Sequence, residues 1–181
     1  MSFAREQQRI VLTGFMGAGK TTVAAALARR LNCAFVDLDE MIERAEQRSV
    51  PALIREEGEA QFRVIETLCL RRVLEEQAAH VIALGGGTWT LSENRAFIIE
   101  HDGFAVWLDA PFELCWQRIK DAEGERPLAQ DIDAARRLFD ERRPVYELAA
   151  LRVAIKADRD PDEVASEIVR ALSEAARCVK N

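Results

Sequence analysis

A complete phosphate-binding motif lies near the start of the chain. Residues 14–21 read Gly-Phe-Met-Gly-Ala-Gly-Lys-Thr and match the pattern G-x-x-x-x-G-K-[ST] in full. The motif follows an apolar run typical of a strand and opens a run typical of a helix. Its glycines let backbone N–H groups curl around phosphate oxygens, and the helix presents its positive end to them. An ordinary glycine-rich turn would not require both pattern and position, so we predict nucleotide binding by Gly17, Ala18, Gly19, Lys20, Thr21 and Thr22.

The side chains at the end of this motif point to Mg-ATP as the ligand. Lys20 supplies a point charge to the β- and γ-phosphates and is therefore also a candidate catalytic residue. The Thr21 hydroxyl is placed to coordinate Mg²⁺, and Thr22 can reach an inner phosphate. The sequence has no base-reading Asn-Lys-x-Asp stretch, as a switch GTPase would, and it is small for a motor protein. A kinase for a small molecule fits best.

Two acids follow the second predicted strand as Asp37-Leu38-Asp39. If this segment is extended, both carboxylates point to the same side, at the carboxyl end of the strand. That end of an open parallel sheet is where ligands bind. One acid could then organise magnesium and its waters, while the other orients or deprotonates an acceptor hydroxyl. The alternative is that one of them caps a helix beginning near Glu40.

Glycines and arginines suggest how an acceptor is held. Gly85, Gly86 and Gly87 follow the third predicted strand, where they permit either close backbone approach to a ligand or a flexible turn. A guanidinium grips a carboxylate or phosphate through two parallel hydrogen bonds. Taken singly, an arginine is usually a solvated surface charge. Together they suit an acceptor that carries its own carboxylate, and the candidates are Arg63, which Glu66 could steer, Arg126 and Arg142.

Short apolar runs alternate with longer amphipathic runs along the chain, which predicts an α/β fold with a parallel sheet flanked by helices. The predicted strands cover residues 10–12, 34–36, 81–84, 104–108 and 152–155. The predicted helices cover residues 20–31, 39–46, 60–77, 92–100, 111–120, 133–148 and 161–178. Residues 121–133 interrupt the alternation, because they are charged and contain Gly124 and Pro127, and we interpret them as an exposed mobile loop.

Composition narrows the class of protein. A chain of 181 residues with 49% hydrophobic and 31% charged residues is expected to form one domain, residues 1–181. Its net charge of −6 argues against binding to nucleic acid. No apolar stretch is long enough to span a membrane, and the start of the chain does not resemble a signal peptide. We therefore expect a cytoplasmic protein, with scattered reduced cysteines and with a small molecule as its partner.

In these motifs the chain resembles the shikimate kinase family, over nearly its whole length and in the same order. The combination of Asp-x-Asp, G-E-x-x-F-R-x-x-E, Gly-Gly-Gly and R-P-L is far more specific than the phosphate loop alone. The matching stretches are residues 14–22, 35–39, 58–59, 62–63, 66, 84–87, 126–128, 141–142, 144 and 146.

The resemblance implies a fold and an activity. The fold would have three layers around a five-stranded parallel sheet of order 2-3-1-4-5, a substrate-binding helical segment over residues 39–66, and a lid at residues 121–133. The activity would be transfer of the ATP γ-phosphoryl group to the 3-hydroxyl of shikimate, a small-molecule substrate, by a monomer that requires Mg²⁺.

On the acceptor side, the resemblance implies that Asp39 binds the ring hydroxyls and acts as base. Asp37 would hold Mg²⁺ through water, together with Thr21. Arg63 and Arg142 would clamp the carboxylate of shikimate, and the backbone of Gly85, Gly86 and Gly87 would line the pocket.

On the nucleotide side, the resemblance implies that Arg126 closes with the lid and neutralises charge on the transferring phosphoryl group. Arg118, Arg159 and Pro161 would flank the adenine.

The chain departs from the family pattern at Ala129 and in residues 88–90. Trp89 beside the presumed pocket is interpreted as packing, with a trimming of the acceptor site as the alternative. The rival functions are a related kinase for another hydroxy acid such as gluconate, and a nucleotide-binding regulatory module without catalysis.

Overall fold

The computed structural model describes residues 8–121 and 131–178. Five parallel strands form one sheet in the order β2-β3-β1-β4-β5, which confirms the predicted fold class and strand order. The strands are β1 (Arg9–Thr13), β2 (Phe35–Asp37), β3 (Val81–Ala83), β4 (Gly103–Asp109) and β5 (Leu151–Ala154).

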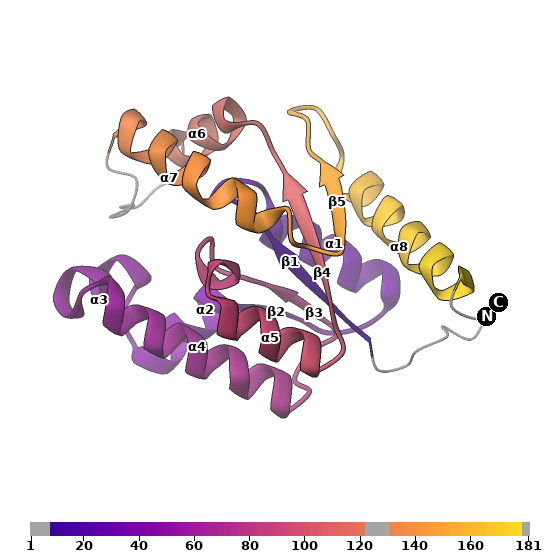
Figure 1. The fold of residues 1–181 in the computed structure, drawn as a ribbon, viewed down its shortest axis with the longest axis horizontal. Helices are drawn as coiled ribbons and strands as arrows, with labels where there is room; N and C mark the ends of the chain where they lie inside the picture. Colours follow the sequence, from indigo (N-terminus) through magenta and orange to yellow (C-terminus); the bar gives the residue numbers. More distant parts are fainter. Residues whose placement is uncertain (1–7, 122–130, 179–181) are drawn as a thin grey trace.

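Helices cover both faces of this sheet (Figure 1), and they pack on each other in sets. Helices α1 and α8 lie together on one face, while α4 and α5 lie together on the other. The helices are α1 (Lys20–Leu31), α2 (Leu38–Glu46), α3 (Val50–Glu57), α4 (Glu59–Glu75), α5 (Ser92–Glu100), α6 (Phe112–Asp121), α7 (Ile132–Tyr146) and α8 (Pro161–Cys178). Within the described residues, none of them is long and apolar enough to cross a membrane.

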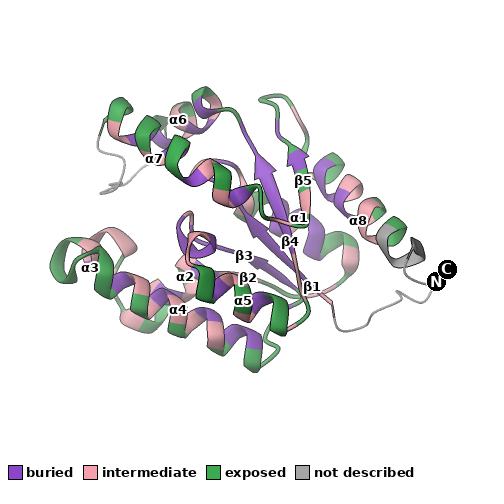
Figure 2. Ribbon diagram, in the orientation of Figure 1, coloured by how far each residue is buried: buried purple, intermediate pink, exposed green. Residues whose placement is uncertain are grey.

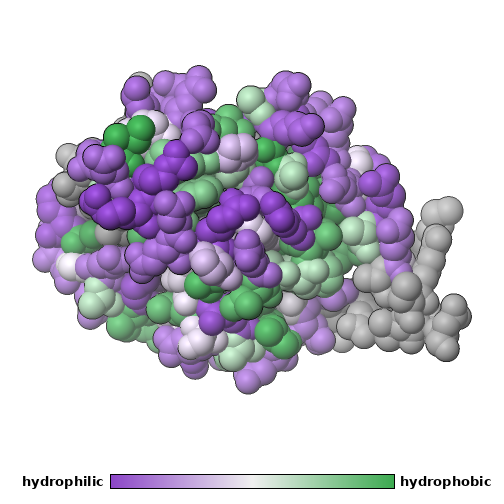
Figure 3. All heavy atoms as spheres, turned by 45° about the horizontal axis from the view of Figure 1, so that its top comes forward, coloured by the Kyte–Doolittle hydropathy of each residue, from purple (hydrophilic) through white to green (hydrophobic). Residues whose placement is uncertain are grey.

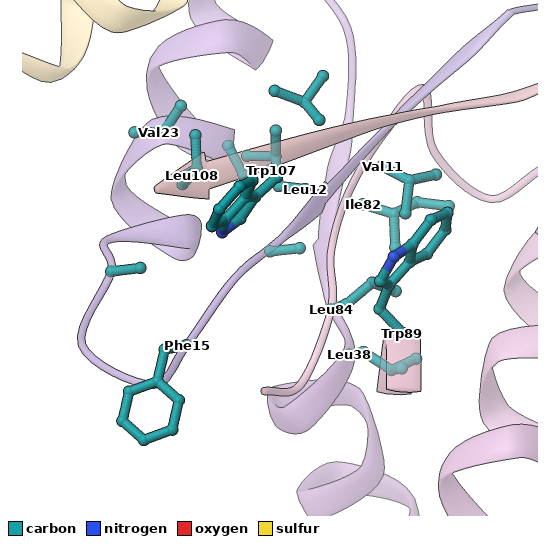
Figure 4. Close-up of a cluster of buried hydrophobic side chains, with 14 of the residues drawn as sticks. Val11, Leu12, Phe15, Val23, Leu38, Ile82, Leu84, Trp89, Trp107 and Leu108 are labelled. Carbon is teal, nitrogen blue, oxygen red and sulfur yellow. The ribbon is translucent and has the colours of Figure 1, made fainter. Parts of the chain in front are cut away.

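The core lies between the sheet and its helices. The central strands β1 and β3 are buried throughout, whereas in the edge strand β5 only Val153 is buried (Figure 2). Two tryptophans, Trp89 and Trp107, lie among the aliphatic side chains of this core (Figure 4). On the face of the molecule seen in Figure 3, hydrophobic side chains are interspersed among hydrophilic ones.

Strand register brings the functional motifs to one edge of the sheet. Leu12 of β1 and Asp37 of β2 both pair with Ala83 of β3. The segments that follow these strands are the phosphate loop (residues 14–21), helix α2, and the glycine loop (Gly85, Gly86 and Gly87). Because parallel strands end together, three segments far apart in the sequence meet at the carboxyl ends of β1, β2 and β3.

All predicted strands and helices are present, with ends that coincide with the prediction or differ from it by one or two residues. Two short elements were missed, helix α3 and the 3₁₀ turn η1 (Thr88–Thr90). Helix α3 has Pro51 in its first turn, where its missing N–H costs nothing, and its Ser49 side chain accepts a hydrogen bond from Ala52 N at 3.3 Å. Its fully buried Leu53 anchors the helix, and sequence alone could not reveal that contact.

The buried carboxylate of Asp109 ties helix α7 and strand β5 to the end of β4. It accepts hydrogen bonds from Arg143 Nη1 at 3.2 Å and from Arg152 Nε at 2.8 Å and Nη2 at 2.5 Å. Both guanidinium groups also lie over the Trp107 ring, 5.3 and 5.1 Å from its centre. Asp109 thus fixes α7, the helix that carries Arg142 into the site.

Replacing Asp109 by Asn should lower the free energy of unfolding by about 1–2 kcal/mol, because the charge-assisted hydrogen bonds that two guanidinium groups donate to this buried carboxylate are weakened. Urea denaturation measures this change. Asp162→Asn is the matched control: its ion pair with Arg29 is exposed on both sides, so a change below about 0.5 kcal/mol is expected. Equal effects of the two substitutions would contradict the anchoring role of Asp109.

Candidate active site

A cavity of about 510 Å³ lies at the carboxyl ends of β1, β2 and β3. The phosphate loop, the start of α2, the first turns of α3 and α4, the glycine loop, α6 and α7 all contribute to its wall. Most of the predicted site residues in the described part of the chain line it: Gly17, Gly19, Lys20, Thr21, Thr22, Asp37, Asp39, Arg63, Gly85, Gly86, Gly87, Arg118 and Arg142.

Other predicted residues lie elsewhere. Ala18 is buried within the phosphate loop. Arg159 precedes α8, where it forms an ion pair with Glu167 and donates a hydrogen bond to Ala154 O at 2.6 Å, and Pro161 is the first residue of α8. Neither lines the cavity. Arg126 lies outside the described residues, as does most of the predicted lid.

The phosphate loop is pressed closely against its neighbours. A Cβ atom on Gly14, with φ of 138°, would lie 2.7 Å from Leu108 O, and one on Gly17, with φ of 78°, would lie 2.7 Å from Cys115 O. Helix α1 begins at Lys20 after Gly19, and no side chain caps it. Its first amides are therefore available to an anion, as the motif requires.

Lys20 lies folded back over the loop. Its ammonium group donates hydrogen bonds to Gly14 O at 2.9 Å and Phe15 O at 3.1 Å. Burial lowers the pKa of Lys20, an effect that the carboxylates of Asp39 and Asp37 oppose. A partly buried cation beside free amides gives the loop the positive charge that suits an anion such as a phosphate group.

The structure shows that the extended interpretation of the Asp37-Leu38-Asp39 segment was wrong. β2 ends at Asp37, whose Oδ1 accepts hydrogen bonds from Asp39 N at 3.0 Å and Glu40 N at 3.3 Å and so caps α2. The alternative, that one acid caps a helix, is confirmed. The short Asp side chain satisfies the amides that a new helix leaves free, which favours helix over continued strand. Asp39 therefore enters the cavity from the first turn of α2.

The other oxygen of Asp37 faces the phosphate loop. Thr21 Oγ1 donates a hydrogen bond to Asp37 Oδ2 at 2.5 Å. A hydroxyl and a carboxylate are the hard oxygen donors that Mg²⁺ prefers, and Mg²⁺ usually takes few protein ligands beside water and phosphate oxygens. No cluster of three or more His, Cys, Asp or Glu ligands occurs in the described part of the chain. Thr21 and Asp37 fit a magnesium site.

Asp39 is a carboxylate with raised proton affinity. Burial, followed by the nearby charges of Glu66 and Asp37, raises the pKa of Asp39 to about 6, against the opposing effect of Lys20 and Arg63. A Cβ atom on Gly85 would lie 2.7 Å from Asp39 Oδ1 and 2.5 Å from Glu66 Oε1. Close approach, and not a flexible turn, therefore explains the glycine at this position. None of the three glycines in the loop has a positive φ.

Glu66 is fully buried and organises the acceptor side of the cavity. Its Oε2 accepts a hydrogen bond from Arg63 Nη1 at 2.7 Å, which confirms that it steers this arginine. Its Oε1 accepts one from the buried Thr88 Oγ1 at 2.6 Å. Sequence reasoning missed Thr88. The only signal was a hydroxyl residue directly after the glycine loop, which does not reveal a partner 22 positions away.

Arg63 and Arg142 converge over the glycine loop from α4 and α7. A Cβ atom on Gly87 would collide with the Arg63 guanidinium, and one on Gly86 would lie 3.6 Å from Arg142 Nη1. Arg142 is buried although it is charged. The two guanidinium groups provide a place for an anion beside Asp39.

Helix α7 is fastened to the glycine loop. Tyr146 Oη donates a hydrogen bond to Gly86 O at 2.5 Å, and Trp89 Nε1 donates one to Val145 O at 3.0 Å. Burial raises the pKa of Tyr146 to about 12, so the hydroxyl remains a donor. Trp89 is buried and does not line the cavity, which confirms its interpretation as a packing residue.

Arg118 closes the nucleotide side of the cavity. Its Nη1 donates a hydrogen bond to Gly17 O at 3.1 Å and would lie 3.5 Å from a Cβ atom on Gly19. This guanidinium therefore lies directly over the phosphate loop.

Comparison with known proteins decides the family. A family model described as shikimate kinase matches residues 16–173. The chain belongs to the shikimate kinase family. A shikimate kinase of Salinibacter ruber is 40% identical over 179 residues, which cover 93% of this chain and 86% of that protein. The phosphate loop of this chain and its membership of a kinase family together establish ATP as a substrate.

Solved structures of shikimate kinases share the fold closely. The enzyme from Aquifex aeolicus superposes with a TM-score of 0.78 at 36% identity, covering 93% of this chain and 98% of that one. The enzyme from Acinetobacter baumannii in complex with shikimate gives a TM-score of 0.81 at 34% identity, covering 94% and 95%.

Replacing Thr88 by Val, which has the same shape, should lower the free energy of unfolding by about 1–3 kcal/mol, because the buried Glu66 loses a hydrogen-bond donor. The control is Thr67→Val, because Thr67 follows Glu66 directly on α4. Within the described residues the buried Thr67 Oγ1 has no hydrogen-bond partner, so its replacement should be neutral or stabilising. Chemical denaturation of both variants tests this, and a neutral Thr88→Val would contradict it.

Proposed function

We propose that the protein transfers the γ-phosphoryl group of ATP to the 3-hydroxyl of shikimate, giving shikimate 3-phosphate and ADP. The observation that carries the proposal is that one cavity joins a complete phosphate loop to Asp39 and to two convergent arginines. The relative from Acinetobacter baumannii is a complex with shikimate, and shikimate has the hydroxyls and the carboxylate that this cavity suits. We infer that residues 1–181 act as one catalytic unit, with residues 39–66 on the acceptor side.

On the nucleotide side, the first amides of α1 and the ammonium group of Lys20 hold the β- and γ-phosphates. Arg118 covers the loop from α6. Thr21 would hold Mg²⁺ directly and Asp37 would hold it through water; the bound ion neutralises negative charge on the phosphates. Arg126, outside the described residues, is proposed to neutralise charge on the transferring group.

On the acceptor side, Asp39 accepts the proton of the 3-hydroxyl while the oxygen forms its bond to the γ-phosphorus. The bond from the γ-phosphorus to the bridging oxygen breaks, and ADP leaves with that electron pair. A base with a pKa of about 6 is largely ionised at pH 7 and still has useful proton affinity. Arg63 and Arg142 hold the carboxylate of the acceptor, and Glu66 keeps Arg63 in place.

An acceptor panel tests the proposal. ADP release is followed in a coupled assay with shikimate, gluconate, a nucleoside monophosphate and no acceptor. We expect release that depends on shikimate. Preference for gluconate would support a related hydroxy-acid kinase, and ATP binding without acceptor-dependent release would support a regulatory module.

Replacing Asp39 by Asn should lower turnover about 100-fold or more while stabilising the fold at neutral pH. In the folded protein the pKa of Asp39 is about 6, against an ordinary value of 3.8, so the ionised form destabilises the fold. This penalty develops as the pH rises from about 4 to 6 and is complete above 6. Urea denaturation should therefore show a gain of about 1–2 kcal/mol at pH 8 that disappears near pH 4.

For the wild type, the same pKa predicts that kcat/KM, which reports ionisations of the free enzyme, falls as the pH drops through about 6, because Asp39 becomes protonated. Near-normal turnover by Asp39→Asn would show that the base is a different group.

Replacing Arg63 by Ala should raise the KM for shikimate at least about 10-fold, with a smaller effect on the KM for ATP, because one half of the carboxylate clamp is lost. Steady-state kinetics with each substrate varied in turn measures both values. The control is Arg72→Ala on the same helix, whose guanidinium pairs with Glu76 at the surface. An unchanged KM for shikimate in Arg63→Ala would rule out the clamp.

A further inference from the structure

A carboxylate of the protein itself lies between the two arginines of the clamp. Glu59 is the first residue of α4, and its Oε1 accepts a hydrogen bond from Arg63 Nη2 at 2.9 Å. The same oxygen lies 4.0 Å from Arg142 Nη2. One oxygen thus faces both guanidinium groups.

The two acids that hold Arg63 differ in their surroundings. Glu66 binds Nη1 from within the core and has no exposed side-chain surface, so it cannot leave without stranding a buried charge. The Glu59 side chain is 45% exposed, so its carboxylate can turn into water at little cost. The Nη2 edge of Arg63 is therefore held by a replaceable partner.

Arg142 is less closely paired with an acidic side chain than Arg63 is. Its side chain is only 8% exposed, and Glu59 is the one acidic group within 4.0 Å of it among the described residues. A separation of 4.0 Å is too long for a hydrogen bond. This buried cation is thus only loosely compensated, and a carboxylate that approached it more closely would gain by doing so.

We infer that Glu59 is an internal competitor of the acceptor: it occupies the carboxylate position of the clamp in the ligand-free protein and must be displaced when the acceptor binds. This inference rests on the proposed function. Exchanging one carboxylate for another keeps Arg63 and Arg142 compensated throughout. Occupation by Glu59 lowers the apparent affinity of every carboxylate ligand by the same factor. The ratio of affinities between two carboxylate ligands is unchanged by this factor, but each needs a correspondingly higher concentration to occupy the clamp. An acceptor that also gains contacts from Asp39 and the glycine loop still binds, whereas a simple carboxylate leaves the clamp largely free.

Replacing Glu59 by Gln tests the displacement. The KM for shikimate should fall about two- to fivefold, with kcat unchanged, because the internal competitor is weakened. Glu59→Asp retains the charge but withdraws the carboxylate by one methylene, so it should also lower the KM. Glu40→Gln is the matched control, because Glu40 lines the same cavity but its carboxylate pairs with Arg44. Its KM for shikimate should stay at the wild-type value.

The direction in which the KM for shikimate changes in each variant distinguishes displacement of Glu59 from other roles of this residue. A higher KM in Glu59→Gln would mean that Glu59 supports Arg63, and an unchanged KM would mean that the position is not occupied; either result overturns the inference. Equal falls in Glu59→Gln and Glu40→Gln, with none in Glu59→Asp, would show a general effect of charge and overturn it as well. Melting temperatures of all variants verify that they are folded.

A second measurement separates this inference from the proposed function. Cyclohexanecarboxylate has a carboxylate but no ring hydroxyl, and its binding to the ADP-loaded protein is measured by calorimetry. Binding should be about two- to fivefold tighter in Glu59→Gln than in the wild type, whether or not shikimate is the acceptor. Equal binding would overturn the inference, while absence of turnover with shikimate in the wild type would overturn only the proposed function.

Discussion

The buried carboxylate of Glu66 is the interaction on which the acceptor side depends. A charge without exposed surface is tolerated only when its oxygens are satisfied, and here Arg63 and Thr88 each satisfy one. The same charge raises the proton affinity of Asp39 on the other side of Gly85. A single buried acid thus holds Arg63 in place, raises the pKa of Asp39, and leaves room only for a glycine at position 85.

Local charge in this cavity overrides the charge of the whole protein. The chain has a net charge of −6, yet four cations, Lys20, Arg63, Arg118 and Arg142, line a cavity suited to two anionic substrates. They are tolerated together because acids stand among them. This arrangement has a cost in stability, since the same burial that lowers the pKa of Lys20 raises that of Asp39. The charged forms of Lys20 and Asp39 are thus both disfavoured by their surroundings in the folded protein.

Rigid connections hold these groups in position. Asp109 fixes α7 to the sheet, and Tyr146 and Trp89 fix its end to the glycine loop. Arg142 directly precedes both attachments along α7, which are at Arg143 and at Val145 and Tyr146, so its guanidinium approaches Gly86 from a fixed direction. By contrast, Glu59 stands at the exposed start of α4 with no such support. The two arginines therefore face one partly exposed carboxylate of the protein itself.

The sequence by itself determined the parallel sheet, the phosphate loop and the identities of the acids and arginines, because periodicity and short motifs are local properties. It did not determine how Asp37 and Asp39 are presented, because Asp37 could either continue the extended strand or end it by capping a helix. It also missed α3 and the bond from Thr88 to Glu66, which depend on burial of Leu53 and on contact across 22 positions. Only the tertiary structure decides such cases, because the energy of a buried contact belongs to both partners and neither reveals it alone.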